Sequence, residues 1–269
     1  MSTTGSMRQG THVRHITADP SRWPRPVILH HIQKTAGTTL GRILNKNYTL
    51  EVTHGFKRGL KDVAEFAERP QAERDSYDYL RGHINFGLHD LLSRPATYVT
   101  LLRHPVDRVL SFYHHVLRTP DHYLYRTGFT ADVSLRELLE QRGCIELDNF
   151  QVRALNRDAD ARPRFGEVDE AMLASARANL DQFDAVGLTE RFDEFAGLVE
   201  RRYGWWVGSY TSARVAPGRP AADDLDGETR RAIERQNELD LALYGDAIRL
   251  FEQRLENPLG PRIFATANR

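Results

Sequence analysis

The chain has 269 residues, 40% of them hydrophobic, which is enough for one α/β domain with a sizeable core. Its 37 basic and 37 acidic residues cancel, so no overall field attracts nucleic acid or an anionic membrane, and any anion must be bound locally. The single cysteine, Cys144, excludes an intramolecular disulfide and argues against a cysteine-based zinc site, so we expect a small buried residue there.

The N-terminal stretch, residues 1–25, is expected to be a flexible tail, and residues 26–269 are expected to form a single domain. The first 25 residues have no apolar core of the kind found in signal peptides. No run of eighteen or more apolar residues, which could span a membrane, occurs in the sequence. We therefore expect a cytoplasmic protein without a membrane segment.

Strand-like apolar runs alternate with helical patterns along the chain. The expected strands are Val27–Ile32, Tyr98–Leu102 and Ala185–Leu188. Helical spacing occurs next at Phe192, Phe195 and Val199, ending near Gly204, and again at Tyr244, Ile248, Phe251 and Leu255. The alternation predicts an α/β fold with a central, mostly parallel sheet flanked by helices. Ligands of such sheets bind at the carboxyl ends of strands, so a site is expected just after the first two strands.

The loop after the first strand reads HHIQKTAGTTLG at residues 30–41 and is typical of an anion site. Small and hydroxyl residues that lead from a strand into a helix leave backbone N–H groups unpaired and directed at one point, which suits a phosphate or sulfate. A Walker A motif needs one glycine six residues before its lysine and another directly before it, and Lys34 has neither, since Gly37 comes after it. The motif therefore does not support a kinase or an ATPase. An ordinary strand-to-helix turn without a ligand remains an alternative.

A second motif, TYVTLLRHPVDRVLSFYHHV at residues 97–116, includes and extends past the second strand. Arg103 stands at the strand end, Pro105 suits the first position of a helix, and Ser111 lies six residues further along that helix. A guanidinium and a hydroxyl can hold a second phosphate from different sides. The alternative for Arg103 is a surface salt bridge, for example with Asp107.

Together the two motifs resemble those of sulfotransferases that use PAPS (3′-phosphoadenosine 5′-phosphosulfate), and the chain is most similar to the heparan sulfate 2-O- and 6-O-sulfotransferase branch. The stretches RGHINF (81–86), DNFQVRAL (148–155) and VGLTERFDEFAGLVERRYGW (186–205) also resemble family segments in the same order. The resemblance spans roughly residues 26–255. It implies a P-loop-like three-layer α/β domain that binds PAPS and releases PAP (3′-phosphoadenosine 5′-phosphate), with no metal expected.

The resemblance also implies roles for individual residues. The loop Lys34, Thr35, Ala36, Gly37, Thr38 and Thr39 would bind the 5′-phosphosulfate, with Lys34 also neutralising the leaving oxygen. Arg103 and Ser111 would hold the 3′-phosphate. Arg214, in the stretch 209–220 that corresponds to a loop closing over the nucleotide, is a weaker candidate.

Transfer to an alcohol requires a base near neutral pKa, for which histidine is the natural choice. His83 matches the family's catalytic histidine in a Gly-His context. His89 is the fallback, while one of His30 and His31 is expected to turn into the sheet as a structural histidine. The group His114, His115 and His122 either lines the acceptor pocket or covers a helix, and a metal site there is not expected.

The sequence thus predicts a PAPS-dependent O-sulfotransferase that acts on a hydroxyl of a small molecule or glycan, with a carbohydrate as the first expectation by resemblance. A nucleotide kinase of related fold and a non-catalytic PAP-binding module remain alternatives. The zero net charge counts against a strongly anionic polymer as the acceptor. Acceptor identity, sulfation position and oligomeric state are left open by the sequence.

Overall fold

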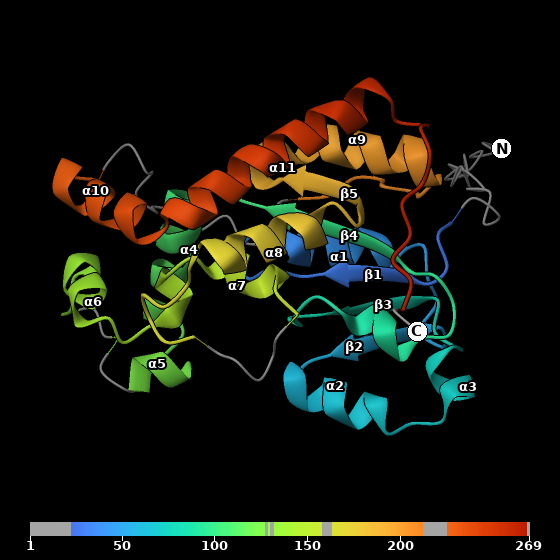
Figure 1. The fold of residues 1–269 in the computed structure, drawn as a ribbon, viewed down its shortest axis with the longest axis horizontal. Coiled ribbons are helices and arrows are strands. Elements are labelled where there is room, and N and C mark those ends of the chain that lie inside the picture. Colours follow the sequence, from blue (N-terminus) through green and yellow to red (C-terminus); the bar gives the residue numbers. More distant parts are fainter. Residues whose placement is uncertain (1–22, 127–128, 130–131, 158–162, 212–224, 268–269) are drawn as a thin grey trace, which may run out of the picture.

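The computed structural model describes residues 23–126, 129, 132–157, 163–211 and 225–267. Its centre is a five-stranded sheet in the order β2-β3-β1-β4-β5, and every neighbouring pair is parallel (Figure 1). The strands are β1 (Val27–His30), β2 (Thr53–Phe56), β3 (Tyr79–Gly82), β4 (Thr97–Leu102) and β5 (Phe183–Leu188). The predicted parallel α/β fold is confirmed.

Helices connect the strands and cover the sheet. They are α1 (Gly37–Leu44), α2 (Leu60–Ala67), α3 (Gln71–Arg74), α4 (Pro105–Leu117), α5 (Tyr123–Arg126), α6 (Leu135–Gln141), α7 (Phe150–Leu155), α8 (Glu170–Leu180), α9 (Phe192–Tyr203), α10 (Gly227–Gln236) and α11 (Glu238–Glu256). All residues of β1, β4 and β5 are buried, so both faces of these three strands are covered, as a parallel sheet requires.

Three strands and three helix features match the prediction closely. The expected runs from Val27, Tyr98 and Ala185 became β1, β4 and β5, with boundaries shifted by up to two residues. The C-cap of α9 is Gly204 in the left-handed conformation, and Pro105 is the first residue of α4. The helical spacing near the C-terminus belongs to α11.

Two strands, β2 and β3, were not predicted as such. β2 reads THGF and β3 reads YLRG, and each has four residues. β2 lies at the edge of the sheet, where three of its four residues are partly exposed, so it lacks the continuous apolar run of a central parallel strand. β3 ends at Gly82, directly before His83.

A second group of buried residues lies to one side of the sheet. Figure 1 shows α4, α5, α6 and α10 together there, at the left. Val109 and Phe112 of α4, Leu138 of α6 and Ile233 of α10 belong to this cluster, as does Cys144. The cysteine is 4% exposed, which confirms the buried residue expected from the sequence.

The start of the domain lies slightly earlier than expected. The predicted tail, residues 1–25, falls outside the described residues up to position 22. The ring of Trp23 packs on Tyr48 with centroids 5.3 Å apart, and the Tyr48 hydroxyl donates to the Pro24 carbonyl at 2.8 Å. Trp23 and Pro24 therefore belong to the packed domain, because an aromatic ring and a buried hydroxyl both fix the chain there.

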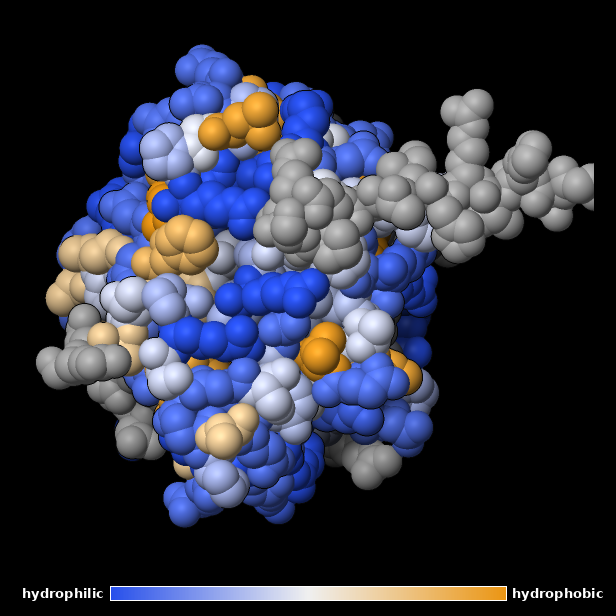
Figure 2. Space-filling view, turned by 90° about the vertical axis from the view of Figure 1, so that its right-hand side faces the viewer, coloured by the Kyte–Doolittle hydropathy of each residue, from blue (hydrophilic) through white to orange (hydrophobic). Residues whose placement is uncertain are grey.

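One face of the molecule shows how its polar and apolar residues are distributed. The face at the right of Figure 1, seen directly in Figure 2, is mostly hydrophilic, and its hydrophobic residues are scattered. Scattered apolar residues are ordinary on a protein surface and carry no functional meaning. No helix within the described ranges is long and apolar enough to cross a membrane.

A buried ion pair joins β5 to α9 and to the C-terminal segment. The Asp184 carboxylate accepts hydrogen bonds from Arg202 Nε at 2.8 Å and from the Tyr203 hydroxyl at 2.7 Å. The Ile263 amide donates to the same carboxylate at 2.6 Å. Arg202 also donates to the carbonyls of Pro258 and Pro261. Both charged side chains are at most 1% exposed, so neither has water as an alternative partner.

We expect Asp184→Asn to lower the free energy of unfolding by about 3–5 kcal/mol, because it leaves the Arg202 guanidinium buried without its countercharge. Urea unfolding measures the change. The double variant Asp184→Leu with Arg202→Met should lose less than the single one. Arg136→Ala, which breaks a pair with Glu228 in which the two side chains are 52% and 65% exposed, serves as the control and should cost under about 1 kcal/mol. Equal losses in Asp184→Asn and the control would contradict the role given to the buried pair.

Candidate functional site

The loop after β1 has the geometry of an anion site. Lys34 and Ala36 both have positive φ values, 69° and 61°, which non-glycine residues adopt rarely. Left-handed residues in such a loop turn successive backbone N–H groups toward one side, and the N-terminus of α1 adds its own unpaired N–H groups. A Cβ on Gly37 would lie 2.1 Å from the His31 ring, so only glycine permits this close packing at the start of α1.

A cavity of about 140 Å³ lies against this loop. Its lining from the loop is Lys34, Ala36, Gly37, Thr38 and Thr39. From elsewhere come Ser111 and His115 of α4, and His31, Gln33 and His83. Seven of these ten residues, all but Gln33, His31 and His115, were predicted site residues, drawn from three separate stretches of sequence. The structure thus brings the loop, Ser111 and His83 to one cavity.

Thr35 belongs to the loop but its hydroxyl is directed inward. Its Oγ1 donates to the Ile32 carbonyl at 2.9 Å, and the residue is 1% exposed. The hydroxyl therefore holds the turn between β1 and α1. A ligand in the cavity meets Thr38 and Thr39 instead, since these two line it and Thr35 does not.

Arg103, at the end of β4, connects the second motif to the loop. Its Nη1 donates to the Lys34 carbonyl at 3.3 Å. Its Nη2 lies 4.0 Å from Asp107 Oδ1, and its Nε lies 3.9 Å from Glu190 Oε1. The salt bridge to Asp107 considered from the sequence is therefore present, at the limit of its distance range. Burial lowers the pKa of Arg103, and the carboxylates of Asp107 and Glu190 oppose that shift.

The buried side chain of Gln151 holds the backbone of Arg103 from both sides. Gln151 Oε1 accepts from the Arg103 amide, and its Nε2 donates to the Arg103 carbonyl, both at 2.9 Å. Asp240 of α11 in turn accepts from the amides of Gln151 and Val152 at the start of α7. Gln151 lies within the stretch DNFQVRAL, in which the sequence indicates no role for it. Its burial and its contact with Arg103 become visible only in the structure.

His83 comes directly after β3 and contacts the loop. Its Nδ1 lies 2.7 Å from the His31 carbonyl oxygen, and the two imidazole rings have centroids 4.2 Å apart. A carbonyl oxygen only accepts hydrogen bonds, so Nδ1 carries the proton in this contact. In the neutral ring Nε2 is then the basic nitrogen. The side chain is exposed and reaches the cavity of the loop.

A second, larger cavity of about 250 Å³ adjoins the first. The two cavities share His31, Gln33 and His83 as lining residues. Its remaining walls come from residues 58–60 at the start of α2, the segment after β3, residues 145–146, helices α7 and α8, and residues 156 and 163. His83 therefore stands between a cavity formed by an anion-type loop and a second cavity that can take another molecule.

The other histidines occupy different environments. His30 is 1% exposed, its Nε2 lies 2.9 Å from the Ala154 carbonyl, and burial lowers its pKa to about 4. His30 is therefore the structural histidine that was expected, because side chains alternate between the two faces of a strand. His89, the alternative base, is buried. Its Nδ1 is hydrogen-bonded to the Tyr98 hydroxyl, and its Nε2 is hydrogen-bonded to Arg157. His89 lines neither cavity. Three further histidines were considered as lining of an acceptor pocket. Of these, His115 lines the cavity of the loop, whereas His114 and His122 do not.

Arg214 lies outside the described residues, so its assignment stays a prediction. Among the residues that the structure describes, no group of three or more His, Cys, Asp or Glu side chains could hold a metal ion. The candidate site is therefore built from a cationic and hydroxyl-rich loop, a serine and a histidine.

The chain matches a known family of proteins. Residues 24–245 match the family described as the sulfotransferase family. Heparan-sulfate 6-O-sulfotransferase 3 of Mus musculus is 29% identical over 284 residues, covering 85% of this chain and 58% of the relative. Heparan-sulfate 6-O-sulfotransferase 1 of Homo sapiens is 29% identical over 285 residues, covering 86% of this chain and 66% of the relative.

Heparan-sulfate 6-O-sulfotransferase 3-B of Danio rerio is likewise 29% identical, over 86% of this chain and 64% of the relative. The chain thus spans less than two thirds of the length of these curated relatives. The family match covers both motifs, the stretch that contains His83 and the helices around them. The resemblance predicted from the two motifs is confirmed, and the chain belongs to the sulfotransferase family.

Proposed function

We propose that this protein transfers the sulfuryl group of PAPS to a hydroxyl of an acceptor, with His83 as the general base. The observation that carries the proposal is the junction at His83, which lines both the cavity of the anion-type loop and the adjoining larger cavity. Membership of the sulfotransferase family supports the same reaction.

The residues present fit a phosphosulfate group. The left-handed backbone at Lys34 and Ala36 and the close approach permitted by Gly37 suit an anion held by backbone N–H groups. The Arg103 guanidinium stands directly beside the loop, where its Nη1 donates to the Lys34 carbonyl at 3.3 Å. The 5′-phosphosulfate of PAPS would be held by Lys34, Thr38 and Thr39 of the loop. Its 3′-phosphate would be held by Ser111.

When bound, PAPS supplies the sulfuryl group, which passes in line from the bridging oxygen of the leaving PAP to the acceptor oxygen. His83 Nε2 takes the proton of the acceptor hydroxyl while that oxygen forms its bond to sulfur. Lys34 balances the negative charge that grows on the bridging oxygen, so its interaction strengthens in the transition state. The His31 carbonyl keeps the His83 ring in the tautomer that this step requires.

The names of the relatives support a carbohydrate as the acceptor class, since each is called a heparan-sulfate 6-O-sulfotransferase. A nucleotide kinase is the alternative for the same loop, and the displaced lysine disfavours it. A non-catalytic PAP-binding module is the other alternative. It leaves the position of His83, oriented at the junction of two cavities, without a purpose.

We expect PAP to raise the melting temperature far more than AMP or ATP with magnesium does. A ligand at a hundredfold excess over its dissociation constant stabilises the folded state by about 2.7 kcal/mol. AMP lacks the 3′-phosphate assigned to Arg103 and Ser111, so its effect should be smaller at equal concentration. Differential scanning fluorimetry measures the shift. Ser111→Ala should narrow the gap between PAP and AMP, and equal shifts by both nucleotides in the unaltered protein would contradict the assignment.

We expect Lys34→Ala to reduce turnover by a hundredfold or more, about the loss caused by removing one charge-stabilising donor, while PAP affinity falls less. Alanine also carries a Cβ, so the substitution leaves the cost of the left-handed backbone at position 34 in place. Transfer of labelled sulfate from PAPS measures turnover, and Lys61→Ala on the exposed side of α2 is the control. Near-normal turnover in Lys34→Ala would remove the lysine from the mechanism.

We expect His83→Asn to lower turnover by about 10²–10⁴-fold and to leave the stabilisation by PAP nearly unchanged, since a general base touches neither phosphate. The asparagine amide can still donate to the His31 carbonyl, so the loop keeps its neighbour. Added imidazole should restore part of the turnover of His83→Ala, because it supplies a base to the space left by the ring. Loss of PAP binding in the folded variants would instead mean that His83 binds the nucleotide.

A further inference from the structure

The larger cavity beside His83, called here the acceptor cavity, has apolar side chains on several sides, interleaved with polar and charged ones. Leu60 comes from the start of α2, Ile84 lies just after β3, Phe150 belongs to α7 and Met172 to α8. Apolar side chains therefore reach this cavity from four separate segments. Such walls suit the apolar body of a ligand, and a few polar groups such as His83 fix its orientation.

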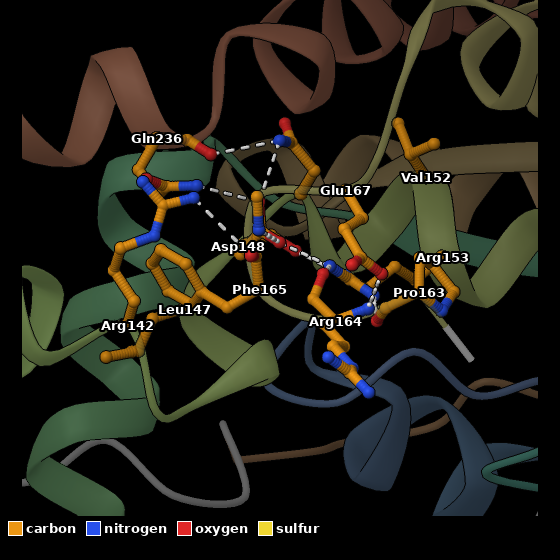
Figure 3. A network of polar contacts seen from close by, with 12 residues as sticks. Arg142, Leu147, Asp148, Val152, Arg153, Pro163, Arg164, Phe165, Glu167 and Gln236 are labelled. Carbon is orange, nitrogen blue, oxygen red and sulfur yellow. Dashed lines mark hydrogen bonds and ion pairs between the residues drawn. The ribbon is translucent and has the colours of Figure 1, made fainter.

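The first of its two lining arginines, Arg153, is occupied by the protein itself (Figure 3). Its Nη2 is paired with the Asp148 carboxylate and donates to the Arg164 carbonyl at 2.8 Å. Its Nε donates to the Asp148 carbonyl at 2.8 Å, and its Nη1 donates to the Pro163 carbonyl. The side chain is only 8% exposed. Arg153 is thus committed to holding α7 and the segment at Pro163, and it presents little charge to a ligand.

The second lining arginine, Arg58, is paired with two carboxylates of α2. Its Nε donates to Asp62 Oδ1 at 2.6 Å, and its Nη2 donates to Glu65 Oε2 at 2.5 Å. Glu146, a third carboxylate, lines the cavity itself. Among the described residues, three carboxylates are paired with the two guanidiniums, those of Asp62, Glu65 and Asp148, and Glu146 adds a fourth to the surroundings of the cavity. Sulfate or carboxylate groups of an anionic polymer would therefore meet more negative than positive charge here.

A third cavity, of about 210 Å³, continues from the acceptor cavity and shares Leu60 and Asn85 with it. Its lining includes Val63, Phe86, Leu88 and Leu91. Arg157 also lines it, but its guanidinium is paired with Asp90 at 2.6 Å. The apolar surroundings thus extend beyond the first cavity, away from His83, and the cation found there is again paired.

From these contacts we infer that the acceptor is an uncharged hydroxyl compound with an apolar portion, bound with its hydroxyl at His83 and its apolar portion along Leu60. This inference rests on the proposed function, since it names the class of molecule that the same site sulfates. It differs from an acceptor like that named for the relatives, because the carboxylates around this cavity outnumber its guanidiniums and would repel a sulfated polymer. An alkyl glycoside has the required chemistry, with sugar hydroxyls at one end and a methylene chain at the other.

The test uses a series of alkyl glucosides from methyl to octyl, each below its micelle-forming concentration, with labelled PAPS and the full chain. Each buried methylene should lower KM by about threefold to fourfold until the chain fills the cavities. The series should respond little to salt, whereas binding of a polyanion through charge would weaken as ionic strength rises. Desulfated heparin serves as the anionic acceptor, and efficient sulfation of it without any dependence on alkyl length would overturn the inference.

A charge placed at Leu60 sharpens the test. Leu60→Lys should raise KM for hexyl glucoside at least tenfold and favour desulfated heparin, while Leu50→Lys, at a residue 84% exposed, should change neither. The melting temperature with PAP bound gives a second readout. If alkyl length does not affect that temperature either, the inference is overturned even though PAP binds. Absence of any stabilisation by PAP would overturn the proposed function instead.

Discussion

The parallel pairing of β1 with a strand on each side is the constraint on which the site depends. His30, the last residue of β1, is in register with Gly82 of β3 and with Thr100 of β4. Parallel strands end at the same edge of a sheet, so the segments that leave their carboxyl ends must meet there. The loop of Lys34, the imidazole of His83 and the guanidinium of Arg103 come directly after these three strands. One hydrogen-bonding pattern thus collects groups that are far apart in the sequence.

Much of this arrangement could be predicted from residues whose role is local. β1 and β4 are continuous apolar runs that end in polar motifs, and Pro105 marks the start of α4, so the loop, Arg103 and Ser111 were placed correctly in the fold. The direction of individual side chains was not predictable. Three threonines lie close after Lys34, and nothing in their order says that Thr35 turns inward to the Ile32 carbonyl while Thr38 and Thr39 line the cavity.

Contacts between distant segments were also beyond the sequence. Gln151 holds the Arg103 backbone across a separation of 48 residues, and Asp240 supports Gln151 from 89 residues further along. Such pairs leave no periodic signal, because each partner looks like an ordinary polar residue in its own segment. The short strands β2 and β3 were missed for a related reason. Their stability comes from neighbouring strands rather than from a long apolar run of their own.

The wall shared by the two main cavities has a consequence for the order of events. His31 and His83 belong to both cavities, and the His83 ring is held by the backbone of the segment that leads into the loop. A ligand that steadies this wall from one side therefore changes the cost of binding on the other side. Thermodynamic linkage makes the effect mutual: whatever factor the nucleotide contributes to acceptor affinity, the acceptor returns to nucleotide affinity. For the proposed reaction, the departure of one product would therefore alter the affinity of the site for the other.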